Sequence, residues 1–156
     1  MAADPPPLRP LPVAEALAIA AGAPHGLLAL GMPGCSACML LPASLAEVQR
    51  SRPGLTVAIG EFATVADWAE RERLLWPRGI HVSRSSVPAL ALLADGVVIA
   101  SRPGGGPAER IDGWLEPLIG PAAHPLGSGP TPGELAALDA LAGRIAYQRH
   151  VKRRGD

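Results

Sequence analysis

Aromatic residues are scarce in this sequence, which has three Trp, one Tyr and one Phe among 156 residues. Apolar residues still make up 48% of the chain, so we expect a packed core built mainly from Ala, Leu, Val and Ile. Charged residues make up only 18%, and the formal net charge is zero. A neutral chain lacks the basic field that captures nucleic acid in bulk, so we expect no nucleic-acid partner. The apolar content also excludes a chain that is disordered throughout.

Long hydrophobic runs are also absent. Residues 16–46 carry no charged side chain, but three prolines and several glycines interrupt them. A membrane-spanning helix needs about 20 consecutive apolar residues, so we expect no membrane partner. The start of the chain is acidic and rich in proline, unlike the basic first region of a signal peptide. We therefore expect a cytoplasmic protein.

Cysteine is the third scarce residue: the chain has two, Cys35 and Cys38. A secreted scaffold held by disulfides would normally carry more. A zinc site needs four ligands, and the sequence offers no second cysteine pair and no spaced histidine pair. An iron–sulfur cluster shared between two chains is disfavoured in the same way, so we expect no metal and no cofactor. Two buried structural thiols are the remaining alternative to a reactive pair, because a free cysteine packs well as a small hydrophobe.

Hydrophobic periodicity and turn residues predict a mixed α/β domain. The order begins strand–helix–strand, which implies a parallel pair with a right-handed crossover. Asp95-Gly96 then marks the two-residue turn of a β-hairpin. A four-stranded mixed sheet with helices on both faces is the compact solution. Helices are expected over residues 13–21, 38–50, 65–76 and 108–119, and strands over 26–31, 55–59, 89–93 and 97–100.

Proline-rich segments divide the chain into four parts. Residues 1–12 are expected to be a disordered lead-in, and residues 13–120 form the domain. Residues 121–132 are expected to be a linker, because proline, threonine and glycine are concentrated there. Residues 133–156 are expected to form an amphipathic helix with a basic tail. This added C-terminal helix either packs on the domain or remains solvated, or else residues 133–154 dock a partner or a second copy.

Cys35 and Cys38 are separated by two residues and follow a buried strand directly. At that junction Cys35 lies where a helix begins, and the free backbone N–H groups there favour a thiolate. A thiolate is the nucleophile in disulfide exchange, so Cys35 is expected to attack a partner. Cys38 lies about one turn further on and is expected to resolve the mixed disulfide. The pattern therefore predicts a redox-active disulfide.

At this point the sequence resembles the thioredoxin-like family, over roughly residues 12–120. The resemblance rests on the 34–38 segment after a buried strand, on Pro42 in the following helix, and on Val87-Pro88 before a hairpin. It implies the thioredoxin fold and a cis peptide bond before Pro88. It also implies that Val87, Pro88 and Gly34 contact the substrate.

Three positions depart from the pattern of thioredoxins proper. The residue before the first cysteine is Gly34 rather than Trp, and Ser36-Ala37 replaces Gly-Pro between the cysteines. A buried Asp that helps proton transfer to the second cysteine is replaced by Ala29. These departures favour a narrow partner over general disulfide reduction.

The resulting hypothesis is a thiol–disulfide oxidoreductase that reduces or exchanges disulfides in a protein partner and is itself served by a reducing partner. The alternative hypothesis is a thioredoxin-like binding or assembly protein with little general reductase activity, in which the dithiol is secondary.

Overall fold

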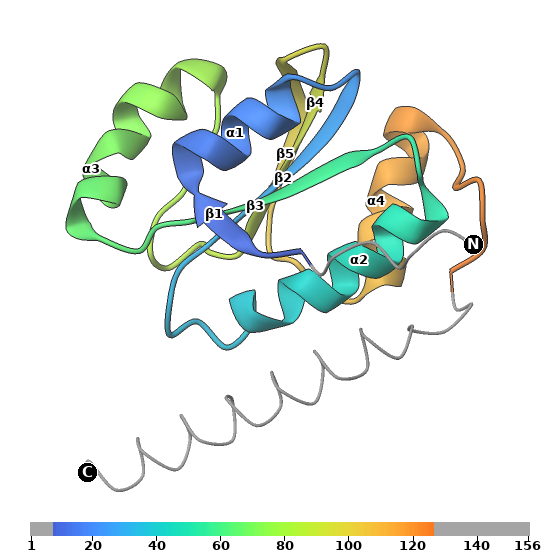
Figure 1. Ribbon diagram of the computed structural model, residues 1–156, viewed down its shortest axis with the longest axis horizontal. Helices are drawn as coiled ribbons and strands as arrows, with labels where there is room; N and C mark the ends of the chain where they lie inside the picture. The colour runs from blue at the N-terminus through green and yellow to red at the C-terminus, as the bar shows by residue number, and fades with distance from the viewer. Residues whose placement is uncertain (1–7, 127–156) are drawn as a thin grey trace, which may run out of the picture.

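A five-stranded mixed sheet lies at the centre of the computed structural model, which describes residues 8–126 (Figure 1). The strand order is β1-β3-β2-β4-β5, with β1–β3 and β3–β2 parallel and β2–β4 and β4–β5 antiparallel. The strands are β1 (Pro10–Pro12), β2 (His25–Gly31), β3 (Thr56–Glu61), β4 (Ala89–Ala94) and β5 (Val97–Pro103).

The predicted count of four strands was wrong, because β1 adds a fifth. This strand is only three residues long, lies within the segment expected to be a lead-in, and contains two prolines. Proline cannot donate to a neighbouring strand, so its presence argued against a strand there. The structure places β1 at an edge of the sheet, paired with β3 alone, where a missing N–H on the outer side costs nothing.

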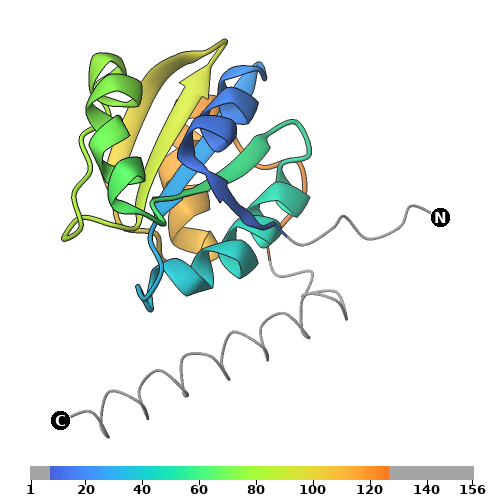
Figure 2. The same cartoon turned by 60° about the vertical axis from the view of Figure 1, so that its left-hand side comes forward.

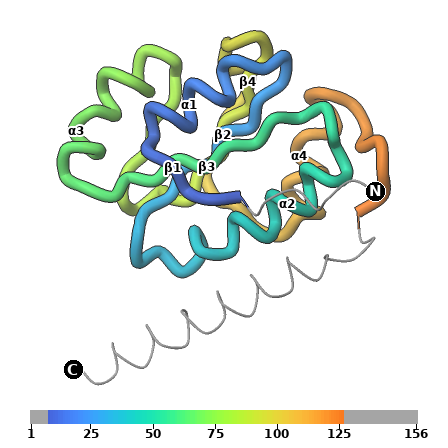
Figure 3. Tube along the Cα trace, in the orientation of Figure 1, coloured from blue at the N-terminus to red at the C-terminus, as the bar shows by residue number. Residues whose placement is uncertain are grey.

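Helices cover both faces of the sheet, as predicted (Figures 1 and 2). The helices are α1 (Val13–Ala21), α2 (Leu41–Ser51), α3 (Val65–Leu74) and α4 (Ala108–Ile119), with short 3-10 turns η1 (Cys38–Leu40) and η2 (Trp76–Arg78). Buried residues of α1 and α3 form one apolar cluster, and those of α2 and α4 form the other. The tube in Figure 3 shows α2 and α4 side by side below the sheet.

Strand β2 contributes side chains to both apolar clusters, one on each face of the sheet. Its side chains alternate, so that Leu28 and Leu30 join the α1/α3 cluster while Leu27 and Ala29 join the α2/α4 cluster. All four are fully buried. A strand covered on both faces has no polar side, which is why this segment reads as an unbroken apolar run.

The predicted hairpin is present, with Asp95-Gly96 joining β4 to β5. Both residues have positive φ, of 48° and 83°, as the tight turns that suit the twist of a hairpin require. Within residues 8–126 no helix combines the length and apolar character needed to cross a membrane. The predicted C-terminal helix and the linker from residue 127 onward lie outside the described residues.

Candidate functional site

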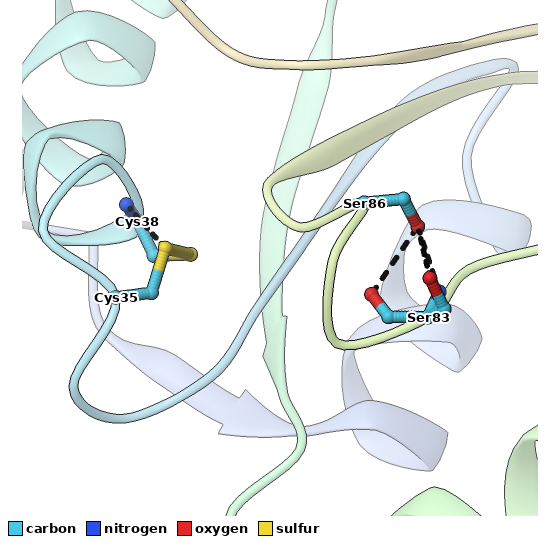
Figure 4. Close-up of a disulfide and its surroundings, with 4 residues drawn as sticks. All are labelled: Cys35, Cys38, Ser83 and Ser86. Atoms are coloured by element: carbon cyan, nitrogen blue, oxygen red, sulfur yellow. Dashed lines mark hydrogen bonds between the residues drawn. A yellow bond between two sulfur atoms is a disulfide. The ribbon is translucent and has the colours of Figure 1, made fainter.

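Cys35 and Cys38 form a disulfide directly after the end of β2, with their Cα atoms 5.2 Å apart (Figure 4). Both residues are half-buried. The backbone N–H of Met39 donates to the carbonyl of Cys35 at 3.2 Å, so the first helical turn starts at Cys35. The backbone N–H of Cys38 points at the sulfur of Cys35, 3.2 Å away. A reduced Cys35 would keep this donor, which favours the thiolate form.

Gly31, the last residue of β2, leaves the space that Cys38 occupies. A Cβ at Gly31 would lie 3.0 Å from the Cβ of Cys38 and 3.1 Å from its sulfur. Both distances are shorter than the roughly 3.5–4.0 Å of a favourable contact between such atoms. Two residues earlier, Ala29 is fully buried in the same apolar cluster against which Cys38 packs. The end of β2 beneath Cys38 therefore carries no titratable side chain, since His25, the titratable residue of this strand, lies at its other end.

The neighbouring strand supplies a carboxylate at this place. Glu61, the last residue of β3, is paired in register with Gly31. Val57 and Ile59 belong to the α2/α4 cluster, so alternation puts Glu61 on the face where Cys38 lies. Glu61 is half-buried. The sequence alone did not indicate Glu61, because it lies 23 positions after Cys38 and only the register of β2 and β3 brings the two segments together.

The Val87–Pro88 peptide bond is cis. Pro88 is buried and Val87 is half-buried. The preceding turn is held internally: the N–H of Ser83 donates to Oγ of Ser86 at 2.7 Å, and the N–H of Ser86 donates to the carbonyl of Ser83 at 3.0 Å. Figure 4 shows the chain after Ser86 extending toward the disulfide. Within residues 8–126, the backbone groups of Val87 take part in no hydrogen bond.

A glycine-rich loop after β5 joins these two parts of the site. The N–H of Gly104 donates to the carbonyl of Pro88 at 2.6 Å. A Cβ at Gly105 would lie 2.9 Å from Cδ2 of Leu41, at the start of α2, and 3.5 Å from Cγ of Pro88. Gly105 therefore lies between α2 and the cis proline, a position set by contacts between segments far apart in the sequence.

Gly34 is exposed, and no heavy atom would lie within 4 Å of a Cβ built on it. Gly34, which stands where thioredoxins proper have Trp, therefore leaves the space beside Cys35 open to solvent. Among the described residues, no group of three or more His, Cys, Asp or Glu side chains lies close enough to hold a metal ion.

Comparison with solved structures finds thioredoxins. Thioredoxin f2 from Chlamydomonas reinhardtii gives a TM-score of 0.55 at 13% identity, over 73% of this chain and 98% of that one. Desulfothioredoxin from Desulfovibrio vulgaris Hildenborough gives 0.52 at 19% identity, over 71% and 97%. Thioredoxin O2 from Arabidopsis thaliana gives 0.50 at 21% identity, over 67% and 84%. No protein-family model and no curated protein matches the sequence.

Proposed function

Because this chain has a thioredoxin-like fold with a CxxC pair joined as a disulfide, we propose that it is a thiol–disulfide oxidoreductase acting on a protein partner. The observation that carries the proposal is the position of the Cys35–Cys38 disulfide, at the end of a central strand and one glycine-rich loop away from Pro88. A pair of inert structural thiols would need neither the backbone donor at Cys35 nor an open Gly34 beside it.

In the first step the thiolate of Cys35 attacks one sulfur of the partner's disulfide. A Cys35–partner disulfide forms, and the partner's other sulfur leaves as a thiolate that takes up a proton. The N–H of Cys38, aimed at the sulfur of Cys35, stabilises the attacking anion. The unpaired backbone groups of Val87 are placed to hydrogen-bond an extended partner segment, and Gly34 leaves room for it.

In the second step Cys38 loses its proton and attacks the sulfur of Cys35. The Cys35–Cys38 disulfide forms and the partner leaves as a second thiolate, so two electrons and two protons have passed to the partner. An external thiol or dithiol then reduces the protein again. In the reverse direction the same two steps transfer the Cys35–Cys38 disulfide to a partner dithiol, which is thereby oxidised. The reduction potential decides the direction, with about −270 mV indicating a reductant and about −120 mV an oxidant.

Insulin reduction with dithiothreitol as the electron source tests the proposal. The wild-type protein is expected to accelerate insulin precipitation, whereas the Cys35→Ser/Cys38→Ser double variant is expected to leave the dithiothreitol background unchanged. Equal rates for both proteins would overturn the oxidoreductase. If the wild type lacks insulin activity but its disulfide still titrates with dithiothreitol, the alternative function is favoured, a thioredoxin-like binding or assembly protein with little general reductase activity.

Glu61 is part of this proposal as the acceptor of the Cys38 proton. An ordinary thiol ionises with a pKa of about 8.5, so at neutral pH the second step needs a base. Glu61 is the carboxylate that the register of β2 and β3 places on the Cys38 side of the sheet. A water molecule between them would complete the path for the proton.

Glu61→Gln is expected to slow resolution of the mixed disulfide by about tenfold to a hundredfold near pH 7, because a positioned base is lost. The difference should shrink toward pH 10, where the thiol ionises without help. Acid quenching followed by mass spectrometry measures the decay of the mixed disulfide at each pH. Glu70→Gln, on the exposed side of α3, is the matched control. A Glu61→Gln defect of the same size at every pH would mean a structural role and exclude proton transfer.

A further inference from the structure

Two arginines flank the glycine-rich loop that forms one wall of the dithiol site. Arg102, on β5, donates from Nη2 to the carbonyl of Gly105 at 2.7 Å. Its guanidinium lies over the ring of Trp114, 5.8 Å from the centroid. Arg110, in the first turns of α4, packs on the same loop, since a Cβ at Gly106 would lie 3.2 Å from its Cδ and 3.5 Å from its Nη1. Both side chains are therefore fixed close to the loop.

This loop packs against Pro88 and against the start of α2, the helix that follows the dithiol segment. Gly104 is hydrogen-bonded to Pro88, and Gly105 is wedged between Pro88 and Leu41, three residues after Cys38. A partner segment lying against Val87 and Cys35 must pass this wall. Arg102 also lines an open hollow of about 210 Å³ that extends to Ser86, at the turn before Val87.

Neither arginine has an ion-pair partner among residues 8–126. Asp112, a half-buried carboxylate on α4, is paired with Arg52. Burial and the positive charge of Arg110 both lower the pKa of Arg102. Two guanidinium groups that repel each other at the rim of a site make the free protein less stable, and a bound anion removes that cost.

The remaining charges near the site do not cancel this field. Arg84, on the turn before Val87, is exposed, and its guanidinium lies over Trp68. Glu61 lies at the end of β3, and two strands, β2 and β4, separate β3 from the β5 that carries Arg102. Glu109, next to Arg110 in the first turn of α4, is exposed and offsets one of the two positive charges. Arg102, Arg110 and Glu109 together keep a net charge of +1, so the rim that faces an incoming partner is basic.

We propose that Arg102 and Arg110 form a carboxylate-binding rim, and that the preferred partner is an acidic polypeptide segment with Asp or Glu close to its reactive cysteine. This inference rests on the proposed oxidoreductase function and names its substrate class. Leu40, which follows Cys38 closely and is 48% exposed, offers an apolar contact beside the charged rim. Such a rim selects partners mainly by raising the association rate of those with complementary charge.

Two synthetic peptides test the rim. Each carries one cysteine as a 2-thiopyridyl disulfide, flanked by Asp and Glu in one peptide and by Lys and Arg in the other. The reduced protein attacks the peptide sulfur, and the released thiopyridone is followed by absorbance. At low salt the acidic peptide is expected to react about tenfold faster or more than the basic one, and high salt should reduce this ratio. A ratio near one, or a faster basic peptide, would overturn the proposal.

Arg102→Gln/Arg110→Gln is expected to bring the ratio to about one. Arg9→Gln/Arg78→Gln, which removes the same charge from exposed positions away from the loop, should keep the full ratio. Arg102→Lys retains the positive charge and should retain most of the preference for the acidic peptide. This variant therefore tests the role of the charge even if the double variant fails to fold.

Reaction with neutral 2,2′-dithiodipyridine distinguishes a failure of the oxidoreductase function from a failure of the carboxylate-binding rim. If the wild type does not react with this reagent, the proposed oxidoreductase function fails. If it reacts normally but does not distinguish the two peptides, only the rim fails.

Discussion

Replacing Cys38 with Ser is expected to leave the protein covalently attached to its partner. Cys35 can still attack, but no neighbouring thiol then releases the mixed disulfide. Intramolecular attack benefits from effective molarities of about 10⁵ M or more, which millimolar external thiol cannot match, so turnover should fall by at least about 100-fold. Non-reducing electrophoresis and mass spectrometry of the Cys38→Ser protein after reaction with a disulfide substrate measure the adduct.

Cys35→Ser serves as the matched control. It removes the thiol whose sulfur receives the N–H of Cys38, so it should form little adduct and show no turnover. Equal trapping by the two variants would contradict the assignment of Cys35 as attacker and Cys38 as resolver. Trapping by Cys35→Ser alone would show that the two cysteines have the opposite roles.

Asp112→Ala is expected to cost about 3–5 kcal/mol of folding free energy, because it leaves a buried guanidinium without its counter-ion. Nε of Arg52 donates to Asp112 at 2.7 Å, and Nη1 of Arg52 donates to the carbonyl of Gly120 at 2.8 Å. The Arg52 side chain is only 6% exposed. These contacts join Arg52, which directly follows α2, to Asp112 within α4 and to Gly120 directly after α4. Urea unfolding followed by circular dichroism measures the loss.

Two further variants provide reference values for the loss of folding free energy in Asp112→Ala. Glu70→Ala breaks the Arg73–Glu70 pair, whose side chains are 71% and 51% exposed, and should cost less than about 1 kcal/mol. Arg52→Met/Asp112→Leu replaces both charges by apolar groups and should recover most of the loss. If Asp112→Ala costs no more than Glu70→Ala, the buried pair has no special weight in holding α2 and α4 together.

Much of the local structure could be predicted from the sequence because the signals were local. The apolar run that became β2 is bounded by glycines, Asp95-Gly96 fixes a tight turn, and the cysteine spacing places two sulfurs one turn apart. The C-terminal boundary of α2 was also anticipated to within one residue of Ser51. Its start was not, because residues 38–40 form a 3-10 turn and Pro42 falls in the first turn of α2 instead of in its interior.

The features that could not be predicted depend on contacts between distant segments. β1 has the composition of an irregular lead-in and becomes a strand only because β3 offers a free edge. The sequence does not distinguish Glu61 from other carboxylates, because its position near Cys38 follows only from its pairing with Gly31 in the sheet. Gly105 lies between Leu41 and Pro88, and no local pattern around residues 104–106 predicts these contacts.

The sequence by itself determined that two thiols would meet at the end of a buried strand, because three residues of separation and one helical turn fix their distance. Only the tertiary structure decided what surrounds them: a carboxylate from the next strand, a wall of glycines against Pro88, and two arginines without carboxylate partners among the described residues. The physical reason is that covalent spacing positions near neighbours, whereas strand register and helix packing determine which distant side chains share the site.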